Sequence, residues 1–145
     1  VTSSHCTTAG ALLNGIPAQS IREVYGVAKA YDTYVGAKKF HGTGRVFDLM
    51  QQLGDEFGST TGRPRQCNWM NIREIKKAID ISGVTTVIIN KVDVMREVGH
   101  WNLRAADNNA LFMQLGSEEG WKSYIRRYLG TGELKVLFSE SPEEI

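Results

Sequence analysis

The chain has 145 residues, of which 41% are hydrophobic and 23% charged, a balance typical of a soluble globular domain that can bury a core. Its 17 Lys and Arg residues nearly balance its 16 Asp and Glu residues, so the net charge of +1 argues against nucleic acid or an anionic membrane as a partner. No apolar run approaches the roughly 20 residues that a membrane-spanning helix needs. Any anionic ligand must therefore be held by a local site.

The two cysteines, Cys6 and Cys67, are far apart and lack the Cys and His spacing of a structural zinc site. We therefore expect reduced thiols, no metal held by this chain and a cytoplasmic location. Val1 stands where a translated chain has Met, and the first eight residues have the composition of a polar loop. We expect a fragment, or a chain whose N-terminal segment is missing.

Apolar residues at helical spacing follow Pro17 and predict a first helix over residues 18–31. A second amphipathic set predicts a helix over residues 46–53 that Gly54 ends. The run 58–65 concentrates glycine, hydroxyl groups and two guanidinium groups. This composition predicts a ligand-binding loop.

Isoleucines at helical spacing predict a third helix from Ile72 to the residue before Gly83. The β-branched run 84–89 that follows predicts a buried strand. Residues 94–115 show no clear periodicity, and the sequence predicts no element there.

Ser117 can cap a further helix, with acidic residues in its first turn, basic residues late and Gly130 just beyond its end. Residues 134–138 then predict a last strand. Strands that alternate with helices predict an α/β fold with a largely parallel sheet and flanking helices. We expect one continuous unit over residues 1–145, without an internal boundary.

The four residues Asn90-Lys91-Val92-Asp93 follow the predicted buried strand and match the NKxD pattern by which many GTP-binding proteins recognise guanine. The carboxylate of Asp93 can accept hydrogen bonds from both N1–H and the exocyclic amino group of guanine, whereas adenine presents the wrong order of donors and acceptors. The stem of Lys91 can lie along the purine face. The alternative interpretation is that Lys91 and Asp93 are solvent-exposed side chains at the end of a strand. Their position directly after a predicted buried strand favours guanine recognition.

No G-x-x-x-x-G-K-[ST] phosphate loop occurs in the chain, so the phosphates of a nucleotide must be held elsewhere. The segment 42–44 lacks the lysine of such a loop and is interpreted as a turn. The hydroxyls and amides of residues 1–4 could contact a phosphate, as could any serine-rich turn.

The run 60–65 offers hydroxyl and backbone donors together with the guanidinium groups of Arg63 and Arg65, each able to bind an oxyanion in a bidentate manner. A small dicarboxylate would suit this loop. The alternative is a surface turn with two solvated arginines. The histidines (His5, His41 and His100) form no recognisable catalytic triad and are interpreted as surface or satisfied side chains, and the aromatics Trp69, Trp121 and Tyr124 are interpreted as core.

Taken in order, four segments resemble the adenylosuccinate synthetase family. They are VTSSHCTTAG at 1–10, KAYDTYVG at 29–36, EFGSTTGRPR at 56–65 with Trp69 after it, and NKVDV at 90–94. The resemblance covers residues 1 to about 95 well and implies a fold like that of P-loop NTPases, here lacking its N-terminal part. Departures from the family pattern are Cys6 as an insertion, Tyr34, Pro64 and Gln66 in place of arginines, a different segment at 38–42, and Ser141 in place of a glycine.

The resemblance also implies residue roles. The substrate nucleotide would be contacted by Thr2, Val35, Gly36 and Arg63. Aspartate would be bound by Ser59, Thr60, Thr61, Gly62, Arg63 and Arg65. The guanine base would be contacted by Asn90, Lys91, Asp93, Ser139, Ser141 and Pro142.

The implied activity is a ligase reaction in purine nucleotide biosynthesis that joins L-aspartate to C6 of IMP, with GTP hydrolysis and a 6-phosphoryl intermediate. The catalytic residues, Mg²⁺ and most of the triphosphate site would belong to the N-terminal part, so this chain alone should bind and not catalyse. Members of the family are typically homodimers. Three alternatives remain: a phage-type 2-aminoadenylosuccinate synthetase that uses dGMP with ATP or GTP, a guanine-nucleotide-binding fragment without catalysis, and a degenerate remnant that persists only as a folding or interaction unit.

Overall fold

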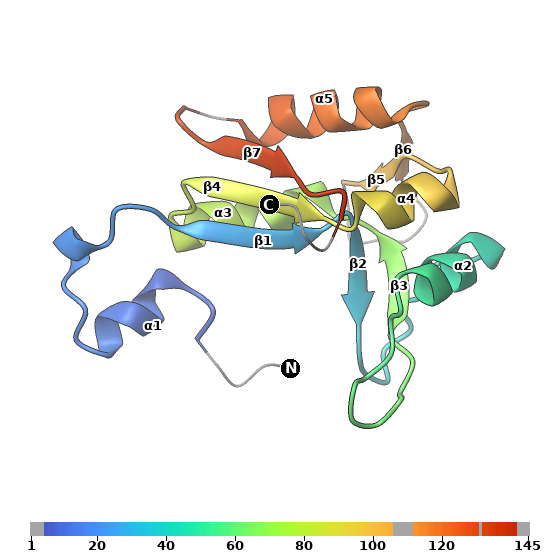
Figure 1. Ribbon diagram of the computed structural model, residues 1–145, viewed down its shortest axis with the longest axis horizontal. Helices are drawn as coiled ribbons and strands as arrows, with labels where there is room; N and C mark the ends of the chain where they lie inside the picture. Colours follow the sequence, from blue (N-terminus) through green and yellow to red (C-terminus); the bar gives the residue numbers. More distant parts are fainter. Residues whose placement is uncertain (1–4, 106–111, 131, 142–145) are drawn as a thin grey trace.

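The computed structural model describes residues 5–105, 112–130 and 132–141 (Figure 1). Its centre is a parallel sheet in the order β1-β4-β7, formed by β1 (Tyr25–Lys29), β4 (Thr86–Asn90) and β7 (Lys135–Phe138). Tyr25 pairs with Thr86, which pairs with Lys135 on its other side. The predicted α/β fold with a parallel sheet is confirmed. Thr2 and Pro142, two of the predicted site residues, lie outside the described residues.

Two antiparallel two-stranded sheets and several helices surround this sheet (Figure 1). One pairs β2 (Tyr31–Tyr34) with β3 (Gln66–Trp69), and the other pairs β5 (Asn102–Arg104) with β6 (Phe112–Gln114). The helices are α1 (Thr8–Leu13), α2 (Arg45–Leu53), α3 (Ile72–Ser82), α4 (Val92–Val98) and α5 (Glu118–Leu129), with a 3-10 turn at Ala18–Ser20. Each helix formed by described residues is too short or too polar to span a lipid bilayer.

Local sequence signals account for three of the four predicted helices. The side chain of Asn71 accepts a hydrogen bond from Arg73 N at the start of α3, and Gly83 ends that helix with a φ of 61°. Ser117 caps α5 by accepting from Gly120 N at 3.1 Å. The expected ends of α2, α3 and α5 are confirmed.

The predicted helix over residues 18–31 is wrong. The segment forms the 3-10 turn, then β1 and the start of β2. Val24 and Val27 are β-branched and Gly26 disfavours a helix, so the local sequence permits a strand. Pairing of the whole of β1 with the buried β4 then outweighs the helical spacing.

The core lies on one face of the parallel sheet. Residues from α3 and α5 pack there with strand residues such as Val87, Ile89 and Phe138. Trp69 and Trp121 are buried and Tyr124 packs against the core, which confirms their interpretation. The opposite face shows Val27 at 66% exposure.

Candidate functional site

The carboxyl ends of the three parallel strands meet at one edge of the sheet, where open α/β sheets bind their ligands. The amide of Ala30 donates to the carbonyl oxygen of Asn90 at 2.8 Å, and the amide of Ser139 donates to that of Ile89 at 2.9 Å. The structure therefore brings the segments 90–93 and 139–141 together, although about 50 residues separate them in the sequence. The described residues predicted to contact guanine all belong to these two segments: Asn90, Lys91, Asp93, Ser139 and Ser141.

Lys91 has an unusual backbone conformation, with φ 63° and ψ 28°. A non-glycine residue in this left-handed region costs about 1–2 kcal/mol, and such strain concentrates at functional sites. The conformation turns the chain from β4 into α4 and directs the side chain of Lys91 to the carbonyl oxygen of Gly54, 3.1 Å from Nζ. The segment 90–93 is thus fixed to the end of α2.

Two acceptor groups lie beside Lys91. The side-chain oxygen Oδ1 of Asn90 is buried and accepts no hydrogen bond from any residue that the structure describes. Asp93 is half-buried in the first turn of α4. A buried acceptor without a donor is costly, by about 1–3 kcal/mol, unless a ligand or water supplies the donor. Nearby, the hydroxyl of Ser139 donates to the carbonyl oxygen of Ser141 at 3.0 Å.

The predicted ligand loop between α2 and β3 is a tight hairpin. Phe57 and Pro64 form an isolated β-bridge that closes its base. Within it, Gly58 N donates to Arg63 O at 2.9 Å and Gly62 N donates to Gly58 O at 2.7 Å. Gly62 has a φ of 61°, which a residue with a side chain adopts only with strain.

The residues at the tip of this hairpin are exposed: Ser59, Thr60, Thr61, Gly62 and Arg63. The hydroxyl of Thr61 accepts a hydrogen bond from Arg63 N at 3.3 Å. The structure therefore brings the predicted aspartate-binding residues together on one solvent-facing loop. Arg65 differs from the rest, because it is half-buried at the base of the loop.

A buried carboxylate that the sequence did not single out lies beneath this loop. Glu56 is 1% exposed and accepts hydrogen bonds from Lys29 Nζ at 2.7 and 2.8 Å, the hydroxyl of Tyr31 at 2.8 Å and Arg65 Nη1 at 2.9 Å. Burial alone would raise the pKa of Glu56, but the hydrogen bonds from these three side chains outweigh it and lower that pKa. Glu56 therefore stays ionised.

The residues expected near the nucleotide, Val35 and Gly36, lie just beyond β2 and next to the start of β3. The side chain of Gln66 connects them to the rest of this region. Its Nε2 donates to the carbonyl oxygens of Gly36 at 3.1 Å and Lys38 at 2.8 Å. Its Oε1 accepts from the amides of residues 40 and 41, at 2.7 and 2.9 Å. Gln66, which stands where the family has an arginine, therefore holds the segment 36–41 in place.

The sequence predicts no site role for the cysteines and histidines. Cys67 is a buried free thiol, and Cys6 is exposed. Burial, followed by the charge of Glu56, raises the pKa of Cys67 to about 12, so this thiol stays protonated. His5 and His100 are exposed, while His41 accepts from Cys67 N at 3.0 Å and lies 3.2 Å from Asp48, which agrees with the interpretation of surface or satisfied histidines.

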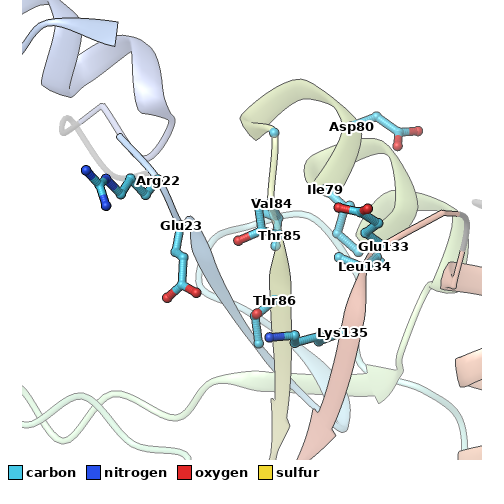
Figure 2. Close-up of a pocket in the computed structure, with 11 residues that line it drawn as sticks. Arg22, Glu23, Ile79, Asp80, Val84, Thr85, Thr86, Glu133, Leu134 and Lys135 are labelled. Atoms are coloured by element: carbon cyan, nitrogen blue, oxygen red, sulfur yellow. The ribbon is translucent and has the colours of Figure 1, made fainter. Parts of the chain in front are cut away.

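A pocket of about 670 Å³ lies at the other edge of the sheet, at the amino ends of β4 and β7 (Figure 2). Figure 2 shows Lys135 beside Thr86, and Glu133 close to Ile79. None of the predicted site residues lines this pocket. Because ligands of open α/β sheets bind at the carboxyl ends, we do not include it in the candidate site.

Comparisons with known proteins indicate the family and the fold of the chain. The pattern that defines the family described as adenylosuccinate synthetase matches residues 1–104. Adenylosuccinate synthetase of Flavobacterium johnsoniae is 44% identical over 100 residues, covering 66% of this chain and 23% of that protein. The enzyme of Deinococcus radiodurans is 40% identical over 103 residues, covering 66% and 25%. A structure of fully ligated adenylosuccinate synthetase from Plasmodium falciparum shares the fold, with a TM-score of 0.79 and 22% identity over 98% of this chain and 43% of that one.

The parallel sheet with its flanking helices defines an α/β protein, and open sheets of this class bind ligands at the carboxyl ends of their strands. The family match covers more than half of the sequence. The chain belongs to the adenylosuccinate synthetase family. It spans about a quarter of the length of the two curated relatives.

Proposed function

We propose that this chain supplies the aspartate-binding loop and the guanine-recognition segment of a ligase that joins L-aspartate to C6 of IMP with GTP hydrolysis. One observation carries the proposal. The two predicted segments, 58–65 and 90–93, belong to one connected region, in which Lys91 contacts Gly54, the residue that follows α2 and precedes the loop by four positions. Family membership supports the same assignment.

In this proposal the edge of the sheet binds the guanine base of GTP. Asp93 accepts from N1–H and from the exocyclic amino group, and the stem of Lys91 lies along the ring. The unused acceptor of Asn90 supports a ligand that brings hydrogen-bond donors. Adenine would leave these acceptors poorly paired.

The hairpin loop would bind aspartate by its carboxylates. The hydroxyls and amides of residues 60–62 surround one carboxylate, and the guanidinium groups of Arg63 and Arg65 bind the other and neutralise its charge. The amino group is then left to react. Its nitrogen forms a bond to C6, the phosphate on O6 leaves with the electrons of the C6–O bond, and the nitrogen releases a proton.

We assign no Mg²⁺ ligand to this chain, because the family resemblance implies that the magnesium site belongs to the N-terminal part. Within residues 5–105, 112–130 and 132–141, no three His, Cys, Asp or Glu side chains form a group that could hold a metal ion. We therefore place Mg²⁺, the triphosphate and the catalytic groups outside this chain in the proposal. A homodimer in the cytoplasm is part of the same proposal.

The test is a ligase assay on the full-length reading frame that contains this chain. Aspartate is offered with IMP or dGMP and with GTP or ATP, and the product is compared between the wild type, Arg63→Leu and Arg127→Leu. We expect product from IMP and GTP, a loss of about 100-fold or more in the Arg63 variant because a charge-assisted contact is removed, and little change in Arg127→Leu, which alters an exposed arginine on α5. Product of equal yield from all three proteins would remove Arg63 from the site.

The same assay separates the first two alternatives. Gln66 and Tyr34 stand where the family resemblance implies arginines, so the nucleotide's surroundings differ from the family's, and dGMP stays a second candidate acceptor. Product from dGMP alone would establish the phage-type 2-aminoadenylosuccinate synthetase activity. Guanine-nucleotide binding without product from any combination would leave the non-catalytic binding fragment.

A further inference from the structure

Glu56 connects the base of the hairpin loop to the parallel sheet. Lys29, which ends β1, and Tyr31, which begins β2, both donate to its carboxylate. The backbone of Glu56 is fixed as well, since its amide donates to Gln51 O at 2.9 Å and its carbonyl oxygen accepts from Arg65 N at 2.9 Å. The position of this carboxylate is therefore determined by three separate parts of the fold.

Arg65 uses a small part of its hydrogen-bonding capacity on Glu56. Its side chain is 34% exposed, and among the described residues it makes one side-chain hydrogen bond, from Nη1 to Glu56 Oε2 at 2.9 Å. A guanidinium group carries five N–H donors in a fixed plane. The remaining donors can receive a second carboxylate in a bidentate manner.

The three ionised side chains of the cluster also carry a net charge. Glu56 supplies one negative charge against the positive charges of Lys29 and Arg65, so one positive charge is in excess among these three side chains. A half-buried positive charge attracts an anionic ligand more strongly than a solvated one, because screening by water is weaker. The excess would be neutralised by one carboxylate bound at the loop.

We propose that Glu56 is a positioning residue that holds Arg65 by one N–H, so that the other donors of the guanidinium receive a carboxylate of the amino-acid substrate. The inference rests on the proposed function, because it assigns the amino acid to this loop. Glu56 itself does not contact the substrate. Its effect is therefore specific to the affinity for aspartate.

The test compares the Michaelis constants of wild type and Glu56→Gln in the full-length reading frame. Glutamine keeps the shape of the side chain. Its amide NH₂ group, however, faces the donors of Lys29, Tyr31 and Arg65, so the guanidinium of Arg65 is no longer held by a carboxylate. We expect the KM for aspartate to rise about tenfold or more, as for the loss of a charge-assisted contact, while kcat and the KM for the purine nucleotide stay within about twofold. Asp80→Asn, which removes the carboxylate that pairs with Lys76 on α3, is the matched control and should leave all three constants unchanged.

A second variant keeps the test decisive if Glu56→Gln does not fold, because that variant leaves Lys29 half-buried without its partner. The double variant Lys29→Met with Glu56→Gln removes both charges and should show the same selective rise in the KM for aspartate. An unchanged KM for aspartate, or equal changes in both Michaelis constants, would overturn the proposal. If the wild type shows no aspartate-dependent turnover, the proposed function fails first and the positioning role falls with it.

Discussion

Lys91 donates a hydrogen bond from Nζ to the carbonyl oxygen of Gly54 at 3.1 Å, and this contact joins the segment after β4 to the end of α2. Glu56 lies two residues beyond Gly54. The segment 90–93 and the base of the hairpin loop are therefore supported by the same short stretch of chain. Lys91 also holds a left-handed backbone conformation. This backbone conformation is strained, and such strain concentrates at functional sites.

We expect Lys91→Gly to separate stability from affinity. Glycine relieves about 1–2 kcal/mol of backbone strain, while the lost hydrogen bond costs about 0.5–1.5 kcal/mol. The free energy of unfolding should therefore change by less than about 1 kcal/mol. Affinity for GTP should fall about tenfold or more, because the stem along the purine ring is lost. Urea unfolding and calorimetric titration with GTP measure the two quantities.

Asp55→Gly is the matched control for that variant. Asp55 is exposed and has a φ of 50°, so glycine relieves the same kind of strain there. We expect this variant to be as stable as the wild type or more so, and to bind GTP with unchanged affinity. Equal losses of GTP affinity in both variants would show that backbone conformation, and not the side chain of Lys91, determines binding.

Gln66→Glu should loosen the segment 36–41. A carboxylate can still accept from the two amides at residues 40 and 41, but it loses the two bonds donated to the carbonyl oxygens of Gly36 and Lys38. Two lost hydrogen bonds predict a KM for the purine nucleotide that rises about tenfold. Steady-state kinetics test this, with Gln52→Glu on the exposed side of α2 as control. An unchanged KM would mean that the nucleotide does not contact this segment.

Arg104 is 4% exposed, and its side chain contacts both strands of the β2–β3 sheet. Its side chain donates to Asp32 Oδ2 and to Trp69 O, both at 2.9 Å, and lies over the ring of Phe40. Burial raises the pKa of Asp32, and the hydrogen bonds from Arg104 and from Asn71 N oppose that rise. Arg104→Met should cost about 3 kcal/mol, because the half-buried carboxylate of Asp32 loses its charged partner and keeps only the hydrogen bond from Asn71 N.

Adding Asp32→Asn to Arg104→Met should restore most of that loss, since no buried charge then remains without a partner. Denaturant midpoints of the two single variants and the double variant form the test. Strictly additive losses would show that the two side chains do not stabilise one another.

An ion-pair network between α4, α5 and the end of β7 predicts a pH dependence of stability. Hydrogen bonds from Arg96, and then from Lys122, lower the pKa of Glu118 to about 2 from the usual 4.5. A carboxyl group with a lowered folded-state pKa stabilises the fold fully above pH 4.5, and this contribution is lost as the pH falls toward 2. Because Arg96 is nearly half exposed, we expect this contribution to the free energy of unfolding to be less than about 1 kcal/mol.

Glu118→Gln should therefore flatten the dependence of the unfolding free energy on pH between about 4.5 and 2. Glu119→Gln, one residue along the same first turn, controls for the effect of the helix dipole on a carboxylate. Stability curves measured at several pH values give the comparison. If the unfolding free energy falls equally at low pH in the wild type and in Glu118→Gln, the ion pairs of Glu118 do not contribute to the pH dependence of stability.

Much of the fold could be predicted from local sequence because particular residues have one interpretation. The β-branched run before Asn90 suits a buried parallel strand, and Asn71, Gly83 and Ser117 mark helix ends by their capping chemistry. The segment 18–31 could not be predicted, because apolar residues spaced for a helix also fit a strand whose partner, β4, lies about 60 residues away. Tertiary pairing decided between them.

In the candidate site, too, local sequence predicts some residues and not others. Ordered motifs located the hairpin loop and the segment 90–93, because the residue types needed for carboxylate and guanine recognition lie close together in sequence. The cluster around Glu56 could not be found by spacing, since its partners Lys29 and Tyr31 are 27 and 25 residues away. A signal existed in the motifs themselves: one carboxylate in EFG and one lysine in KAY.

The most direct test of the central claim is product formation by wild type and Asp93→Asn with GTP or XTP as phosphate donor, in the full-length reading frame with aspartate and IMP. Asparagine presents a donor where aspartate accepts, and xanthine carries an oxygen where guanine carries the amino group. We predict that the variant loses activity with GTP and gains it with XTP. Equal activity of both proteins with GTP would contradict guanine recognition at this edge of the sheet.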